Sequence, residues 1–197
     1  MFERVSVLEK PIAAGGRTGR NGATALRMGL RRHWHLVQLG TYAGRTEALN
    51  ATLLATLGVA LPVSSSEVLR HERHQLYRLA ADQYWIVTED ATVPAKLARA
   101  VPADIASLTA LSHARVRIAL QGGAAVALLG KLVSVDLRPQ SFAIGSFAQT
   151  GLHHVGVLLE RLGADSFELY VLRTYAASTW EWMLDAALPF GYEVFSE

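Results

Sequence analysis

Two periodicities alternate along this chain, and their order repeats once. Apolar residues with a period of two predict strands, and a period of 3.6 predicts helices. The first half predicts strands at 33–40, 66–70, 75–80 and 84–89, with helices at about 44–57 and after Thr92. The second half predicts strands at 114–123, 146–150, 154–160 and 167–174, with helices at about 123–131 and 177–188. Each half therefore reads strand, helix, two hairpin-like strands, strand, helix.

The repeated order predicts an α+β protein with two small lobes, each an antiparallel sheet covered by helices. We expect the first lobe at 31–103 and the second at 104–197. Residues 1–30 have no clear period and carry four glycines over 15–22. Because glycine loses much backbone entropy on folding, residues 1–30 are predicted to form a flexible N-terminal arm.

Two patterns within these elements indicate surfaces that a partner protein covers. In strand 114–123, Arg115 and Arg117 alternate with apolar residues and so face away from the core. In the last helix, Trp182 lies about 200° from the core stripe that begins at Trp180. We expect Arg115, Arg117 and Trp182 at a partner interface. The alternative for Trp182 is packing beneath the C-terminal tail.

Composition narrows the class of partner. Hydrophobic residues make up 51% of the 197 positions and charged residues 18%, against about 25% charged in an average protein. A surface covered by partners explains this, and so does a sequence rich in alanine. The net charge of +2 is too small to indicate nucleic acid. No cysteine is present and no apolar run reaches the roughly 18 to 20 residues that span a bilayer. We expect a cytoplasmic protein with neither a nucleic-acid nor a membrane partner.

Motifs for catalysis or metal binding are missing from the sequence. The histidines include three close pairs, His33/His35, His71/His74 and His153/His154, but none belongs to an HExxH motif. Gly122 and Gly123 follow a strand without a GxGxxG pattern, so a tight turn explains them as well as a nucleotide does. There is no GxSxG elbow. We therefore expect no catalytic, cofactor-binding or metal-binding residue in this chain.

The second half carries two longer motifs. The segment LSHARVRIALQGGAAVALLGKLVSVDLRPQSF (111–142) joins a Ser-His-x-Arg strand, a glycine turn, an Ala/Leu helix and an apolar-Asp-Leu-x-Pro segment. Near the end, an Arg-x-[FY]-Ala-x-Ser-x-Trp-x-Trp-[LM] run occupies 173–183. With these motifs, the region over about 105–192 resembles the gamma subunit family of heterotetrameric sarcosine oxidase.

The resemblance implies a fold like that of the glycine cleavage aminomethyltransferase and other folate-binding proteins. It implies a non-catalytic gamma subunit that scaffolds the alpha subunit, in a complex that also contains beta and delta subunits. Such a complex demethylates sarcosine oxidatively and passes the one-carbon unit to tetrahydrofolate. The resemblance places FAD, FMN, NAD, tetrahydrofolate and zinc in the partner subunits, and no cofactor in this chain.

A free-standing folate-binding protein or one-carbon transferase of the same fold is the alternative. It requires a cavity with a carboxylate for the pterin and basic groups for the glutamate tail. Asp136, Glu181 and Arg173 supply these groups, but the sequence does not show that they converge. A third alternative, a purely structural domain, explains the same patterns with fewer assumptions.

Overall fold

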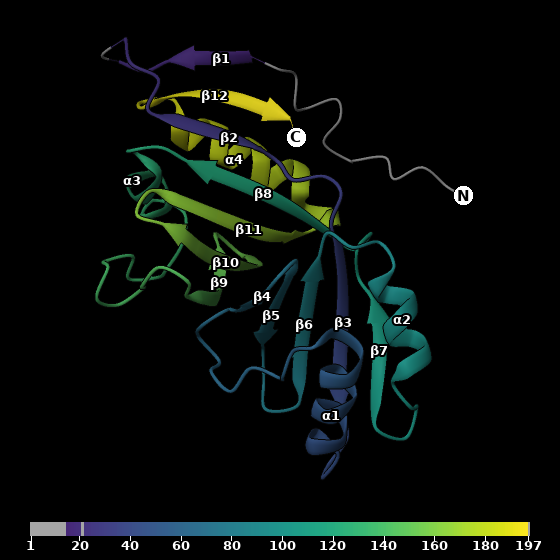
Figure 1. The fold of residues 1–197 in the computed structure, drawn as a ribbon. Coiled ribbons are helices and arrows are strands. Elements are labelled where there is room, and N and C mark those ends of the chain that lie inside the picture. Colours follow the sequence, from purple (N-terminus) through teal and green to yellow (C-terminus); the bar gives the residue numbers. More distant parts are fainter. Residues whose placement is uncertain (1–14, 21, 197) are drawn as a thin grey trace. The chain divides into compact units, whose positions relative to one another are not determined.

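The computed structural model describes residues 15–20 and 22–196, and within them the chain divides into two compact units (Figure 1). One unit contains residues 33–112. The other joins the described residues up to Arg32 with those from His113 onward. Both combine a sheet of mainly antiparallel strands with helices, so the predicted α+β class is confirmed. None of the helices in the described residues is long and apolar enough to cross a membrane.

The unit of residues 33–112 is built on a five-stranded antiparallel sheet with the order β4-β5-β6-β3-β7. Its elements are β3 (His35–Thr41), α1 (Thr46–Leu57), β4 (Leu69–His71), β5 (His74–Arg78), β6 (Gln83–Thr88), α2 (Val93–Ala100) and β7 (Ala106–Ala110). Helix α1 ends at Gly58, which takes a left-handed φ of 70° that glycine adopts without strain. Pro94 lies in the first turn of α2, where its missing N–H leaves no hydrogen bond unmade.

The core of this unit forms between its helices and one face of its sheet. Leu49 and Leu53 of α1 and Leu97 of α2 are fully buried. They pack in one cluster with alternate strand residues such as Val37 and Leu39. The period-two and period-3.6 patterns of the sequence thus meet in a single apolar layer.

The second unit is built on a seven-stranded sheet with the order β1-β12-β2-β8-β11-β10-β9. Its elements are β1 (Gly15–Thr18), β2 (Leu26–Leu30), β8 (Arg115–Gln121), α3 (Ala125–Leu129), β9 (Phe147–Leu152), β10 (Val155–Gly163), β11 (Ser166–Leu172), η1 (Arg173–Tyr175), α4 (Ala176–Ala187) and β12 (Gly191–Ser196). Neighbouring strands of the described residues are antiparallel, except that β12 runs parallel to β2. Trp180 and Met183 of α4 are fully buried and join the core cluster with β2, β8, β10 and β11.

The two units share the topology of the predicted repeat. In one, the strands run β4-β5-β6-β3 across the sheet, and in the other β9-β10-β11-β8 follow the same order. The fifth position differs between the units. It holds β7, which follows its helix, in the smaller sheet, and β2, which precedes β8, in the larger one.

The N-terminal prediction and the lobe boundary both differ from the structure. Residues 15–18 and 26–30 are strands of the larger sheet, not a flexible arm. Their backbone groups pair with β12 and β8, which offsets the entropy that the glycines lose. Residues 1–14 and 21 lie outside the described residues. The boundary predicted at 103/104 lies before β7, yet β7 pairs with β3 in the smaller sheet.

A glycine in β2 makes close packing of the larger sheet possible. A Cβ atom at Gly29 would overlap the carbonyl oxygen and the ring of Phe195 on the neighbouring strand β12. We expect Gly29→Ala to lower the free energy of unfolding by about 1 to 3 kcal/mol, as overpacking typically does. Urea denaturation measures this. Gly156→Ala is the matched control, because a Cβ there has no heavy atom within 4 Å; equal losses from both variants would contradict the packing argument.

Candidate functional site

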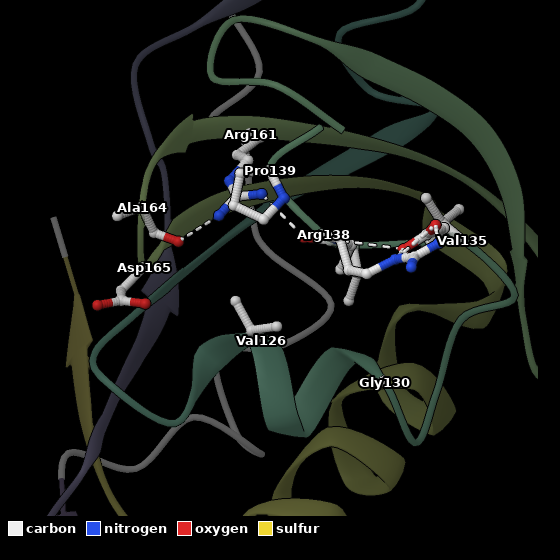
Figure 2. A pocket seen from close by; sticks show the side chains of 10 residues that line it. Val126, Gly130, Val135, Arg138, Pro139, Arg161, Ala164 and Asp165 are labelled. Carbon is white, nitrogen blue, oxygen red and sulfur yellow. Dashed lines mark hydrogen bonds and ion pairs between the residues drawn. The ribbon is translucent and has the colours of Figure 1, made fainter. Parts of the chain in front are cut away.

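A cavity of about 460 Å³ opens in the unit with the larger sheet. Its walls come from α3, from residues 135–139 and from the turn between β10 and β11. Figure 2 shows Val126 of α3 on one side, with Pro139 and Arg161 across from it. The remaining apolar wall includes Val135 and Leu137. Polar chemistry in this cavity therefore rests on a few arginine and aspartate side chains.

Arg161 is the buried charge of the cavity, with an exposure of 4%. Its guanidinium donates to the carbonyl oxygens of Leu137 (2.9 Å), Phe142 (2.8 Å), Gly163 (3.1 Å) and Ala164 (2.9 Å). It also lies over the ring of Phe167, 5.3 Å from the centroid. Within the described residues, no carboxylate forms an ion pair with Arg161. The side chain thus ties residues 137–142 to the β10–β11 turn, and four neutral acceptors surround its charge.

Asp136 and Arg138 form an exposed pair at the same cavity. Arg138 Nε donates to both carboxylate oxygens of Asp136, at 2.8 and 3.0 Å, and Ser141 Oγ donates to Oδ2 at 2.8 Å. The hydrogen bonds from Arg138, followed by the one from Ser141, hold the pKa of Asp136 well below its ordinary value. Asp136 in turn raises the pKa of Arg138. The carboxylate is therefore ionised and already engaged, which leaves it poorly suited to act as a general base.

The three residues that a folate site would need do not converge in this cavity. Asp136 lines it, but Arg173 and Glu181 are not among the lining residues. Arg173 begins the short helix η1, and Glu181 is exposed on α4. The pairing of Asp136 with Arg138 further removes it from the role of a pterin-holding carboxylate.

A buried ionic cluster lies on the larger sheet, and its residues are not among those that line the cavity. Glu168 of β11, 1% exposed, accepts from Arg117 Nε at 2.6 Å and from Arg31 Nε at 3.0 Å. We call Arg31, Arg117 and Glu168 the Glu168 cluster. The sequence correctly placed Arg117 opposite the core-facing residues of β8, but the side chain is only 7% exposed and pairs within the chain. The Arg117 side chain is therefore buried and paired, and it does not lie on the open surface that its alternation in β8 led us to expect.

The other two predicted interface residues are half-buried. Burial lowers the pKa of Arg115. Trp182 packs partly against the core and meets the edges of two histidine rings at the β9–β10 turn. The ring centroids lie 4.9 Å from His153 and 5.2 Å from His154. Trp182 thus packs over this turn and keeps part of its surface open.

The histidine pairs do not assemble a metal site. No group of three or more histidine, aspartate or glutamate side chains that could hold a metal ion occurs in the described part of the chain. His74 is instead buried, and its Nδ1 lies 2.9 Å from Thr88 Oγ1. Burial lowers the pKa of His74, and this effect outweighs the negative charges of Asp90 and Glu72, which raise it.

The lowered pKa of His74 predicts a pH dependence of stability. In the unfolded chain His74 binds a proton near pH 6.5, whereas in the folded chain it does so only at lower pH. The free energy of unfolding is therefore highest above about pH 6.5 and falls as the pH decreases. We expect His74→Gln to flatten this fall between about pH 7 and pH 5. Urea unfolding of both proteins across this range measures the difference. A variant whose stability falls as steeply as that of the wild type would contradict the assignment.

Sequence reasoning missed Arg161 and Glu168. Arg161 shares the core-facing register of β10 with Val157 and Leu159, so a charge in an apolar row was the available signal. Glu168 could be paired with Arg117 only once the register of β8 and β11 was known, since the two residues are far apart in the sequence.

Comparisons with known proteins agree on one family. The model of the GCVT N-terminal domain matches residues 74–196. The gamma subunit of sarcosine oxidase from an Arthrobacter species is 28% identical over 192 residues, which are 96% of this chain and 95% of that protein. The gamma subunit from Corynebacterium sp. strain P-1 is 28% identical over 195 residues, 98% of this chain and 96% of that protein.

Solved structures give the same result. A chain of heterotetrameric sarcosine oxidase from Corynebacterium sp. U-96 matches with a TM-score of 0.77 and 26% identity, over 86% of this chain and 87% of that one. Aminomethyltransferase T of the glycine cleavage system from Bartonella henselae matches with a TM-score of 0.60 and 20% identity. That match covers 87% of this chain but 48% of the transferase, and it shows a shared fold.

Proposed function

The chain belongs to the GCVT N-terminal domain family, and from that membership we propose that it is the gamma subunit of a heterotetrameric complex of the sarcosine oxidase type. The observation that carries the proposal is the extent of the matches. Gamma subunits align over 95% and 96% of their own length, whereas the aminomethyltransferase aligns over 48% of its length. The chain thus matches gamma subunits over nearly their whole length, and it matches the aminomethyltransferase over about half of its length.

The role proposed for this subunit is structural. Most polar groups of its cavity are engaged within the chain, as Asp136 pairs with Arg138 and Arg161 donates four of its five N–H bonds to backbone carbonyls. Thr88 and His74 bring a hydroxyl and an imidazole within 2.9 Å of each other, but both side chains are buried and so are closed to a substrate. The subunit would therefore contribute buried contact area that holds and orients the alpha subunit, with beta and delta completing the complex.

The chemistry of the complex would lie in the partner subunits. We assign to them the oxidative demethylation of sarcosine and the transfer of the one-carbon unit to tetrahydrofolate, with FAD, FMN, NAD and zinc bound there. Trp182 is the contact residue that we favour on this chain, because it keeps open surface beside the β9–β10 turn. Aromatic side chains of this kind often anchor interfaces. Arg115, half-buried on β8, is the second, and Arg117 is already bound in the Glu168 cluster.

Co-expression with the alpha, beta and delta subunits tests the proposal. We expect the chain to elute with them as one coloured species in size-exclusion chromatography with light scattering. Trp182→Lys should weaken assembly by about thirtyfold, the effect of losing a contact worth about 2 kcal/mol. Tyr42→Lys, at an aromatic residue of the other unit with 48% exposure, is the matched control. A colourless monomer that ignores all three partners would disprove the subunit role.

A further inference from the structure

Arg161 carries a buried charge that no carboxylate of the described residues neutralises. Its side chain is 4% exposed, and its acceptors are four neutral backbone carbonyls. Arginine does not lose its proton in proteins, so a change of ionisation cannot relieve the cost of this burial. Buried charges are normally paired, and none of the described carboxylates forms an ion pair with this one. An anion in the cavity would supply the opposite charge that these neutral acceptors lack.

One N–H bond of the guanidinium remains for such an anion. Of its five N–H bonds, Nε uses one, Nη1 two and Nη2 one for the carbonyl acceptors. The second N–H of Nη2 has no acceptor among residues 15–20 and 22–196. Because Arg161 lines the cavity, an anion bound there can take this bond, and a charge-assisted hydrogen bond is about twice as strong as a neutral one.

The cavity wall selects the kind of anion. Val126, Val135, Leu137 and Pro139 present an apolar surface, and the volume of about 460 Å³ lies within the roughly 300 to 1,000 Å³ of small-molecule sites. Arg138 neutralises Asp136, and the remaining lining carboxylate, Asp165, would repel a second negative charge on the ligand. We propose that this cavity binds a small monocarboxylate with an apolar body, whose carboxylate accepts from Arg161. This site is independent of the structural role proposed above.

Titration calorimetry of the purified chain with benzoate as the probe tests this site. We expect benzoate to bind at least about tenfold more tightly than benzamide, which has the same shape without the charge. Inorganic phosphate, largely a dianion at pH 7.5, should not bind. Figure 2 shows Val126 on the wall facing Arg161, so Val126→Trp should fill the cavity and abolish benzoate binding without touching the guanidinium.

Val63→Trp makes the same change at a valine of the other unit that is 85% exposed, and it should bind benzoate as the wild type does. Equal affinities for benzoate and benzamide would overturn the proposal. So would a Val126→Trp chain that binds benzoate normally, or no detectable binding at about 10 mM benzoate, the limit of a weak small-molecule site. None of these outcomes depends on whether the chain assembles with partner subunits.

Discussion

Replacing Glu168 by glutamine is expected to lower the free energy of unfolding by about 3 to 5 kcal/mol, the usual cost of breaking a buried ion pair. The Glu168 side chain is 2% exposed and the Arg117 side chain 8% exposed, so water screens their interaction little. Glu168 also accepts from Arg31, which directly follows β2, so the pair joins the end of β2 to β11 across β8. An amide keeps the shape but removes the charge and one of the two acceptor oxygens. Both guanidinium groups thus lose the carboxylate to which they donate.

The matched control is Glu193→Gln in the same sheet. Glu193 pairs with Arg27 at 3.4 Å, but both side chains are more than half exposed. An exposed pair contributes about 0 to 1 kcal/mol, so this variant should unfold at nearly the wild-type urea concentration. If Glu168→Gln proves as mild as Glu193→Gln, the buried cluster does not stabilise the sheet.

Periodicity predicted the helices and the long strands because their side chains meet a local core. The helices expected at about 44–57 and 177–188 are α1 and α4, each within two residues. Strands β2 and β12 were missed, since each is held by pairing with a strand distant in sequence. Their parallel pairing brings the two ends of the described chain together, which no local pattern indicates. The same holds for β7, whose partner β3 decides the unit to which it belongs.

The burial of Arg117 could not be predicted for a related reason. Alternation in β8 shows which way Arg117 points, but not what lies there. Glu168 on the neighbouring strand, together with Arg31, makes the position buried and paired. The neighbours of Trp182 belong to a turn that the sequence does predict. Both histidines that it contacts come from the β9–β10 turn, and the sequence places a break between strands near residue 153. Side-chain direction is thus readable from sequence, whereas burial depends on register.

Replacing Arg161 by methionine is expected to lower the free energy of unfolding by about 3 to 5 kcal/mol, because several carbonyl oxygens lose their donors at once. Leu137 and Phe142 lie on one segment, whereas Gly163 ends β10 and Ala164 begins the β10–β11 turn, so the guanidinium holds these two regions together. Methionine fills a similar volume and fits the apolar row of β10, so the loss reports the hydrogen bonds and not a cavity. Chemical denaturation monitored by circular dichroism gives the value.

Arg138→Met removes the other arginine of the same cavity and is the control. Its pair with Asp136 is exposed, with side-chain exposures of 70% and 41%, so the change in unfolding free energy should stay within about 1 kcal/mol. Arg161→Lys separates charge from geometry, because lysine keeps the charge but cannot reach acceptors on two loops in one plane. We expect it to destabilise the chain nearly as much as methionine does. A lysine variant as stable as the wild type would show that the charge alone, and not the network of four carbonyls, keeps an arginine at this position.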